Sequence, residues 1–138
     1  MLDGYIRVAC ASFETRIADV IYNSQEIKKR IDITRQENAK IVVFPELCLS
    51  GYTIEDLFLQ NRLLNECLNQ LEEIVKYTQG YQQIVVVGLP FFYQNSLYNV
   101  AAIINNGQLL ALVPKTHIPN YQEFYEGRRF EPCFEDNL

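Results

Sequence analysis

Three charged side chains that could do chemistry together follow the ends of predicted strands. Glu46 comes directly after the apolar run 41–44 and Pro45, while Lys115 and Glu123 follow the last apolar segment of the chain. In open α/β sheets, ligands and catalytic groups gather outside the carboxyl ends of the strands. A glutamate there can act as a general base, and a lysine can stabilise a developing oxyanion. The pattern alone leaves open that these are a surface lysine and two structural or exposed glutamates.

The strands that would position these groups are predicted from short apolar, β-branched runs between turn residues. They cover residues 6–12, 41–44, 84–89, 97–104 and 109–113. We expect Pro90 to terminate the third strand, because proline cannot donate to a sheet ladder. Asn106 and Gly107 stand between the last two strands, and both residues tolerate the positive φ of a tight turn. The sequence therefore predicts a β-hairpin at the end of the sheet.

Two helices are predicted between the first three strands. Asn23 and Glu26 have the spacing of a capping box, so we expect the first helix to begin at Asn23 and to end near Asn38. The second helix should cover residues 61–77, where apolar side chains repeat at intervals of three and four. The order strand, helix, strand, helix, strand and hairpin predicts an α/β fold with parallel early strands and right-handed crossovers.

Composition excludes several classes of function. The chain has 138 residues, of which 49% are hydrophobic and 21% charged, and this is enough for one compact domain. A net charge of −5, with no basic cluster larger than residues 28–30, argues against a nucleic-acid surface. We find no signal-peptide core and no apolar run of membrane-spanning length, so we expect a cytoplasmic protein that does not bind membranes.

The four cysteines and the single histidine are too scattered to predict a zinc site. Free thiols in a reducing compartment fit this spacing better than a disulfide framework. We expect structural positions in the core for Cys10, Cys48 and Cys67. His117 stands two residues after Lys115, and we expect it to form structural hydrogen bonds rather than to act as a base or metal ligand.

Two motifs resemble the signatures of the nitrilase (carbon–nitrogen hydrolase) superfamily. The stretch VFPELCLSGY at 43–52 is similar to the first signature and KTHIP at 115–119 to the second, with Glu123 at the matching distance beyond it. Within the superfamily, residues 50–58 and 119–130 look most like the glutaminase domains of glutamine-dependent NAD synthetases. The resemblance covers about residues 6–134. It implies the N-terminal half of a nitrilase-type α-β-β-α sandwich.

The resemblance also implies roles for individual residues in the hydrolysis of the glutamine amide by a cysteine thiolate. Glu46 would be the general base, Lys115 would stabilise the tetrahedral oxyanion, and Glu123 would orient the lysine and the substrate. Tyr121 and Tyr52 would belong to the glutamine pocket. The released ammonia would be channelled to a second, ATP-dependent domain that amidates deamido-NAD to NAD.

The sequence departs from this family pattern in one decisive respect. The family's nucleophilic cysteine lies on a later strand that is absent here, and Cys133 follows Glu123 too closely to replace it. The resemblance thus implies that residues 1–138 are a partial glutaminase domain, inactive or nearly so alone. No cofactor is expected in it, since ATP and magnesium would belong to the missing synthetase domain. We expect an uncovered apolar sheet face and self-association into a homo-oligomer.

Two other functions stay open. The chain could belong to a different carbon–nitrogen hydrolase that acts on a small amide or nitrile, although residues 50–58 and 119–130 argue against this. It could also be a natural half-domain that serves as a non-catalytic interaction or regulatory module. A partner and a stable, monodisperse protein would be the hallmarks of such a module.

Overall fold

The computed structural model describes residues 4–52, 61–117 and 130. Its strands are β1 (Val8–Cys10), β2 (Ile41–Val43), β3 (Ile84–Tyr93), β4 (Ser96–Asn105) and β5 (Gln108–Pro114), and its helices are α1 (Val20–Gln36) and α2 (Asn61–Tyr77). The strands form one five-stranded sheet in the order β1-β2-β3-β4-β5. β1, β2 and β3 are parallel, whereas β4 and β5 are antiparallel to their neighbours. The predicted α/β fold with parallel early strands is confirmed.

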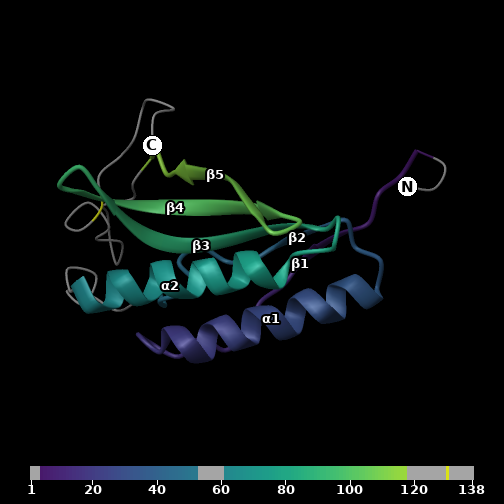
Figure 1. The fold of residues 1–138 in the computed structure, drawn as a ribbon, viewed down its shortest axis with the longest axis horizontal. Helices are drawn as coiled ribbons and strands as arrows, with labels where there is room; N and C mark the ends of the chain where they lie inside the picture. The colour runs from purple at the N-terminus through teal and green to yellow at the C-terminus, as the bar shows by residue number, and fades with distance from the viewer. Residues whose placement is uncertain (1–3, 53–60, 118–129, 131–138) are drawn as a thin grey trace.

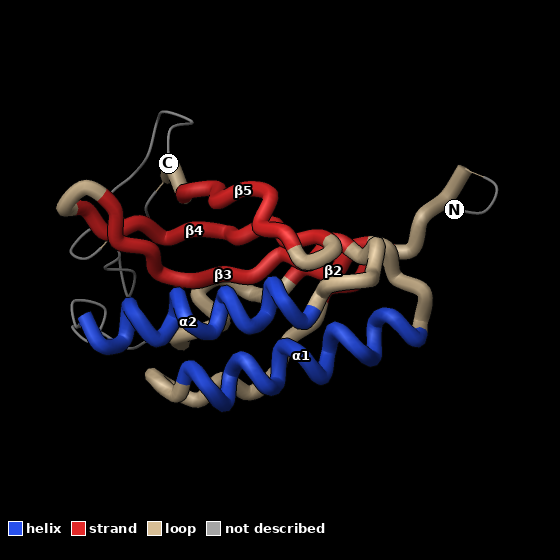
Figure 2. Tube along the Cα trace, in the orientation of Figure 1, coloured by secondary structure: helices blue, strands red, loops and turns tan. Residues whose placement is uncertain are grey.

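Both helices cover the same face of the sheet (Figures 1 and 2). The connections β1–α1–β2 and β2–α2–β3 advance across the sheet in the same direction. When two such connections have the same handedness, their helices lie on the same face of the sheet. The core between helices and sheet is fully buried and includes Ile27, Ile31, Ile74, Val42, Val85 and Val87. Neither helix of the described part is long and apolar enough to cross a membrane.

The opposite face of the sheet carries a row of apolar side chains that are partly or largely exposed. Cys10, Val43, Val86 and Ile103 lie side by side across four strands through their pairing registers. Val43 is 41% exposed, and Cys10 is exposed as well. The predicted exposed apolar surface is therefore present on part of this face, but the predicted core position of Cys10 is wrong. Side chains alternate along a strand, so in β1 Ala9 packs against the core and Cys10 points away from it.

The first helix begins earlier than its sequence pattern suggested. α1 starts at Val20, and the side chain of Asp19 caps it by accepting a hydrogen bond from the Tyr22 N–H at 3.1 Å. The prediction of Asn23 as the first residue is wrong, because Asn23 lies inside the helix and is fully buried. The second helix has the predicted bounds, and β1 is shorter than the predicted segment 6–12.

The prediction that Pro90 ends the third strand is also wrong, because β3 continues through it to Tyr93. The carbonyls of Val86 and Gly88 accept hydrogen bonds from the Phe44 and Leu49 N–H groups, on the side away from β4. Backbone groups alternate sides with a period of two, so the Pro90 nitrogen also points away from β4. Its missing N–H therefore removes no bond from the β3–β4 ladder.

The predicted hairpin between β4 and β5 is confirmed. Asn106 and Gly107 form its turn, with φ of 46° and 75°. A second hairpin, not predicted from the sequence, joins β3 and β4 through Gln94 and Asn95, whose φ values are 47° and 64°. These two turns fold β3, β4 and β5 into a continuous antiparallel unit. The chain leaves β5 at the same edge of the sheet at which it leaves β2.

Candidate active site at the carboxyl edge of the sheet

Two of the predicted site residues meet at this edge, which we call the carboxyl edge because β1, β2 and β3 end there. Lys115 Nζ lies 2.5 Å from Glu46 Oε1, although the two residues are 69 positions apart in the sequence. Glu46 follows β2 and Lys115 follows β5. Both side chains are partly exposed, at 40% for Glu46 and 29% for Lys115. A bound molecule could therefore reach a carboxylate and an ammonium group at the same point.

A third residue, Asn99 in β4, joins this pair. Its side-chain amide Nδ2 donates a hydrogen bond to Glu46 Oε1, the same oxygen that Lys115 contacts. Its backbone carbonyl accepts a hydrogen bond from the Lys115 N–H at 2.8 Å. Sequence reasoning missed Asn99. A signal was present, because asparagine is disfavoured in strands and this one stands inside the apolar segment 97–104.

The loop that carries Glu46 lies directly against β3 at Gly88. A Cβ atom on Gly88 would lie 2.5 Å from the Leu47 nitrogen and 2.8 Å from the Pro45 oxygen. The Gly88 carbonyl also accepts a hydrogen bond from the Leu49 N–H at 3.2 Å. Glycine inside a strand often marks such a close approach of another backbone. The absence of a side chain at Gly88 thus sets how closely Glu46 approaches the sheet.

The same loop is held in an uncommon conformation by groups from α1. Leu47 has a φ of 53°, which non-glycine residues rarely adopt, and its side chain is fully buried. Asn23 donates from Nδ2 to the Leu49 carbonyl at 3.1 Å and to the Arg16 carbonyl at 2.8 Å. These bonds explain why Asn23 is buried in the helix rather than capping it. Locally unfavourable backbone that the surroundings hold in place is typical of functional sites.

The two buried thiols near this region are structural. Cys48 Sγ donates to the Gly88 carbonyl at 3.7 Å, and burial raises the pKa of the Cys48 thiol to about 12. Burial likewise raises the pKa of Cys67 in α2 to about 12. Cysteine attacks as a thiolate, and both groups are protonated at neutral pH. The predicted structural positions of Cys48 and Cys67 are confirmed.

The remaining predicted site residues contribute less to this geometry. Tyr52 is partly buried and packs against the core. His117 is exposed. Glu123, Tyr121 and Cys133 lie outside the described residues. Within the ranges that the structure describes, no group of three histidine, cysteine or acidic side chains is placed to hold a metal ion.

Comparison with known proteins agrees with the geometry of this edge. The model of the family "Carbon-nitrogen hydrolase" matches residues 7–136. A curated relative, the glutamine-dependent NAD(+) synthetase of Mycobacterium tuberculosis, is 37% identical over 129 residues. That alignment covers 94% of this chain and 19% of the relative. The chain therefore spans about a fifth of the length of this relative.

Solved structures show the same fold. A glutamine-dependent NAD(+) synthetase from Cytophaga hutchinsonii matches with a TM-score of 0.89 at 27% identity, over 96% of this chain and 22% of that chain. An amidase from Nesterenkonia sp. matches with a TM-score of 0.78 at 19% identity, over 94% of this chain and 49% of that chain. The five-stranded sheet and its two helices thus match structures of the nitrilase fold.

Proposed function

Because the chain belongs to the carbon–nitrogen hydrolase family, we propose that it forms part of a glutaminase that releases ammonia from the side-chain amide of glutamine. The observation that carries this proposal is the contact of Lys115 with Glu46 at the carboxyl edge of the sheet. The relatives named as glutamine-dependent NAD synthetases support glutamine as the substrate. The resemblance of residues 50–58 and 119–130 to such glutaminase domains agrees with them.

The chemistry assigned to the two residues follows from their charges. The Glu46 carboxylate takes the proton of a cysteine thiol, and the thiolate attacks the amide carbon of glutamine. The Lys115 ammonium stabilises the negative charge that develops on the amide oxygen. Glu46 returns the proton to the departing ammonia and then activates the water that hydrolyses the thioester. We place the nucleophilic cysteine outside the described residues, on the later strand that the family resemblance implies.

The proposal extends to the protein that carries this sequence. Ammonia from this site would be used by an ATP-dependent synthetase domain, with magnesium, to amidate deamido-NAD to NAD. Glu123 would orient Lys115 and the substrate, and Tyr121 and Tyr52 would contribute to the glutamine pocket. We propose a cytoplasmic location, where free thiols stay reduced.

The test compares two nitrogen sources in the complete protein that carries this sequence. Lys115→Met should lower the rate of glutamate release and of glutamine-dependent NAD formation by about 10²- to 10³-fold, because one group that stabilises the oxyanion is lost. NAD formation from added ammonium should stay unchanged. Lys76→Met is the matched control, since Lys76 is 63% exposed on α2, and it should leave both rates unchanged.

The same assay separates the alternatives. Hydrolysis of small amides without hydrolysis of glutamine would contradict the glutaminase proposal and favour another carbon–nitrogen hydrolase. A wild-type protein that hydrolyses no amide would favour a non-catalytic module. Equal losses in Lys115→Met and Lys76→Met would contradict the role given to Lys115.

The exposed apolar side chains on this sheet face support a further proposal, that residues 1–138 alone form a homo-oligomer. Large contiguous apolar patches on soluble proteins usually mark contact surfaces. Val43 belongs to the apolar row on this face and is 41% exposed. Sedimentation of residues 1–138 should show association that Val43→Lys weakens. A wild-type monomer at all concentrations would contradict this proposal.

A further inference from the structure

Asn99 contacts both Glu46 and Lys115 from a buried position in β4. Its side chain donates to Glu46 Oε1, and its backbone carbonyl accepts from the Lys115 N–H at 2.8 Å. It is only 3% exposed, whereas the two charged side chains are partly open to solvent. The most buried member of this group is thus its neutral member.

We propose that Asn99 is a positioning residue that fixes the Glu46 carboxylate beside Lys115 for amide hydrolysis. This inference rests on the proposed glutaminase function. Asn99 itself transfers no proton in this assignment. It acts through Glu46, by holding the general base in one orientation.

The ion pair alone would not hold the carboxylate in place. Partly exposed ion pairs contribute little free energy, because two long side chains must be ordered in water. Asn99 is anchored differently, since β4 pairs it with Pro90 of β3 and its side chain is buried. A short, buried donor loses little rotamer freedom when it binds the carboxylate. Asn99 on its strand therefore fixes the position of the Glu46 carboxylate, and the more flexible Lys115 contributes the positive charge.

The two donors place the two oxygens of the Glu46 carboxylate in different surroundings. Both Lys115 and Asn99 donate to Oε1 of Glu46. Among the described residues, no donor to Oε2 of Glu46 is found. A general base needs an accessible oxygen within hydrogen-bond reach of the proton that it takes. Neither Lys115 nor Asn99 donates to Oε2, and the bond from Asn99 to Oε1 determines where Oε2 points.

The test uses two substitutions of similar size in the complete protein. Asn99→Leu removes the donor, and Asn99→Asp replaces it with a second carboxylate, while both keep the backbone bond to Lys115. We expect the kcat for glutamine hydrolysis to fall by about 10- to 100-fold with little change in KM, because a misplaced base affects the chemical step. Ammonium-dependent NAD formation should stay unchanged, which shows that the protein is folded.

The split between kcat and KM separates positioning from a merely structural role. A distorted substrate pocket would raise KM, whereas a misplaced base lowers kcat and leaves KM nearly unchanged.

Asn105→Leu is the matched control on the same strand. Asn105 donates from Nδ2 to the Gln82 carbonyl at 2.9 Å at the other end of β4. This variant should be less stable but should keep the wild-type kcat and KM. A wild-type kcat in both Asn99 variants would overturn the inference, as would a raised KM at an unchanged kcat. A wild-type protein that hydrolyses no glutamine would contradict the proposed function itself, and with it this inference.

Discussion

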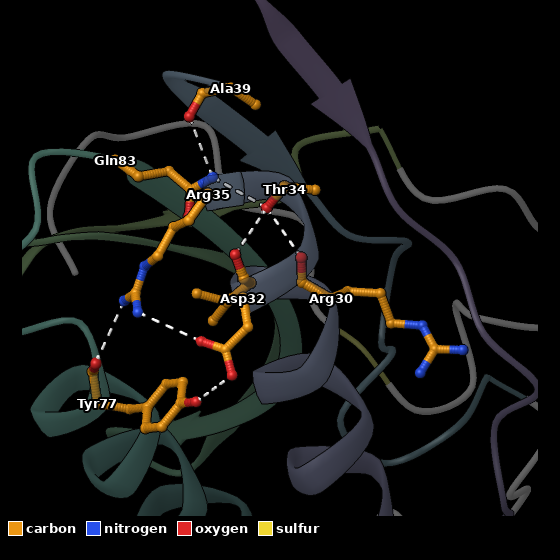
Figure 3. A network of polar contacts seen from close by, with 8 residues as sticks. Arg30, Asp32, Thr34, Arg35, Ala39, Tyr77 and Gln83 are labelled. Carbon is orange, nitrogen blue, oxygen red and sulfur yellow. Dashed lines mark hydrogen bonds and ion pairs between the residues drawn. The ribbon is translucent and has the colours of Figure 1, made fainter. Parts of the chain in front are cut away.

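Two polar clusters lie at opposite edges of the same sheet. The site cluster consists of Glu46, Asn99 and Lys115 at the carboxyl edge. The helix-end cluster consists of Asp32, Thr34, Arg35, Tyr77 and Gln83 at the amino edge (Figure 3). Both contain ionisable side chains joined by hydrogen bonds. They differ in how those bonds are distributed.

In the helix-end cluster, the hydrogen bonds between described residues go to separate acceptor atoms. Tyr77 Oη donates to Asp32 Oδ2 at 2.5 Å, and Arg35 Nη2 donates to the Tyr77 carbonyl at 3.3 Å. Gln83 Nε2 donates to Thr34 Oγ1 at 2.9 Å. The hydrogen bond to Asp32 raises the pKa of Tyr77, so the hydroxyl stays a donor. These bonds tie the last turns of α1 and α2 together, as Figure 3 shows.

In the site cluster, two donors converge on one oxygen, and the surrounding backbone departs from local preferences. Gly88 lies inside a strand, Leu47 has a positive φ, and Asn99 stands in an apolar strand. Departures from local preference are expected where a protein retains a function rather than stability. The comparison teaches that the amino edge stabilises the fold, whereas the carboxyl edge positions charged groups for chemistry.

Outside the charged pair itself, the largest effect is expected from Gly88→Ala. The added Cβ would lie 2.5 Å from the Leu47 nitrogen, so the loop that carries Glu46 must move. We expect a loss of about 10²-fold in glutamine hydrolysis, because displacements of about 1 Å can have that effect. Overpacking should also lower the free energy of unfolding by about 1–3 kcal/mol.

Glutamine kinetics and urea unfolding measure both effects of Gly88→Ala. Unchanged glutamine hydrolysis would show that the approach of the loop to β3 does not determine the position of Glu46.

A second, smaller effect concerns the two buried thiols near the carboxyl edge. Cys48 lies in the site loop and Cys67 in α2, and the pKa of each is about 12 against an ordinary 9.0. Unfolded thiols ionise above that ordinary value while the folded ones do not, so stability should fall as pH rises from about 9 toward 12. At pH 10 the expected loss is about 1 kcal/mol for each thiol.

Unfolding by urea at pH 8 and pH 10 tests this dependence. Cys67→Ala should reduce the difference between the two pH values, whereas Cys10→Ala, at an exposed thiol, should not. Cys67→Ala should also leave glutamine hydrolysis unchanged. A difference between pH 8 and pH 10 that is the same in wild type and Cys67→Ala would contradict the assigned cause.

The smallest effect is expected from Tyr77→Phe in the helix-end cluster. The substitution removes the hydrogen bond to Asp32 but keeps the ring near Arg35. We expect the free energy of unfolding to fall by about 1 kcal/mol, in line with a single hydrogen bond. The kcat for glutamine should not change. A clear loss of kcat without loss of stability would contradict the assignment of stability to the amino edge and of chemistry to the carboxyl edge.

Much of this fold could be predicted because its signals are local. The repeat of apolar residues at 61–77 predicted α2, and Asn106-Gly107 predicted its hairpin. The position of Glu46 after a buried strand indicated the edge at which the site lies. Lys115 was found in the same way, since β5 ends at that edge.

The rest depended on contacts that are distant in the sequence. Asn23 was interpreted as a helix cap, but its side chain serves the Leu49 carbonyl, 26 residues away. Pro90 was expected to end a strand, yet its nitrogen faces the side without a strand partner. The role of Asn99 follows from a partner 53 positions earlier. No local pattern contains these pairings, because they arise only when the sheet assembles.

The most direct test of this account replaces one carboxylate by an amide in each cluster. Glu46→Gln and Asp32→Asn should be compared in the complete protein by glutamine hydrolysis and by thermal unfolding. The account predicts that Glu46→Gln loses glutamine hydrolysis by about 10²- to 10⁴-fold at an unchanged melting temperature. It predicts that Asp32→Asn keeps the wild-type kcat and melts at a lower temperature. Wild-type hydrolysis by Glu46→Gln, or an equal loss in Asp32→Asn, would contradict it.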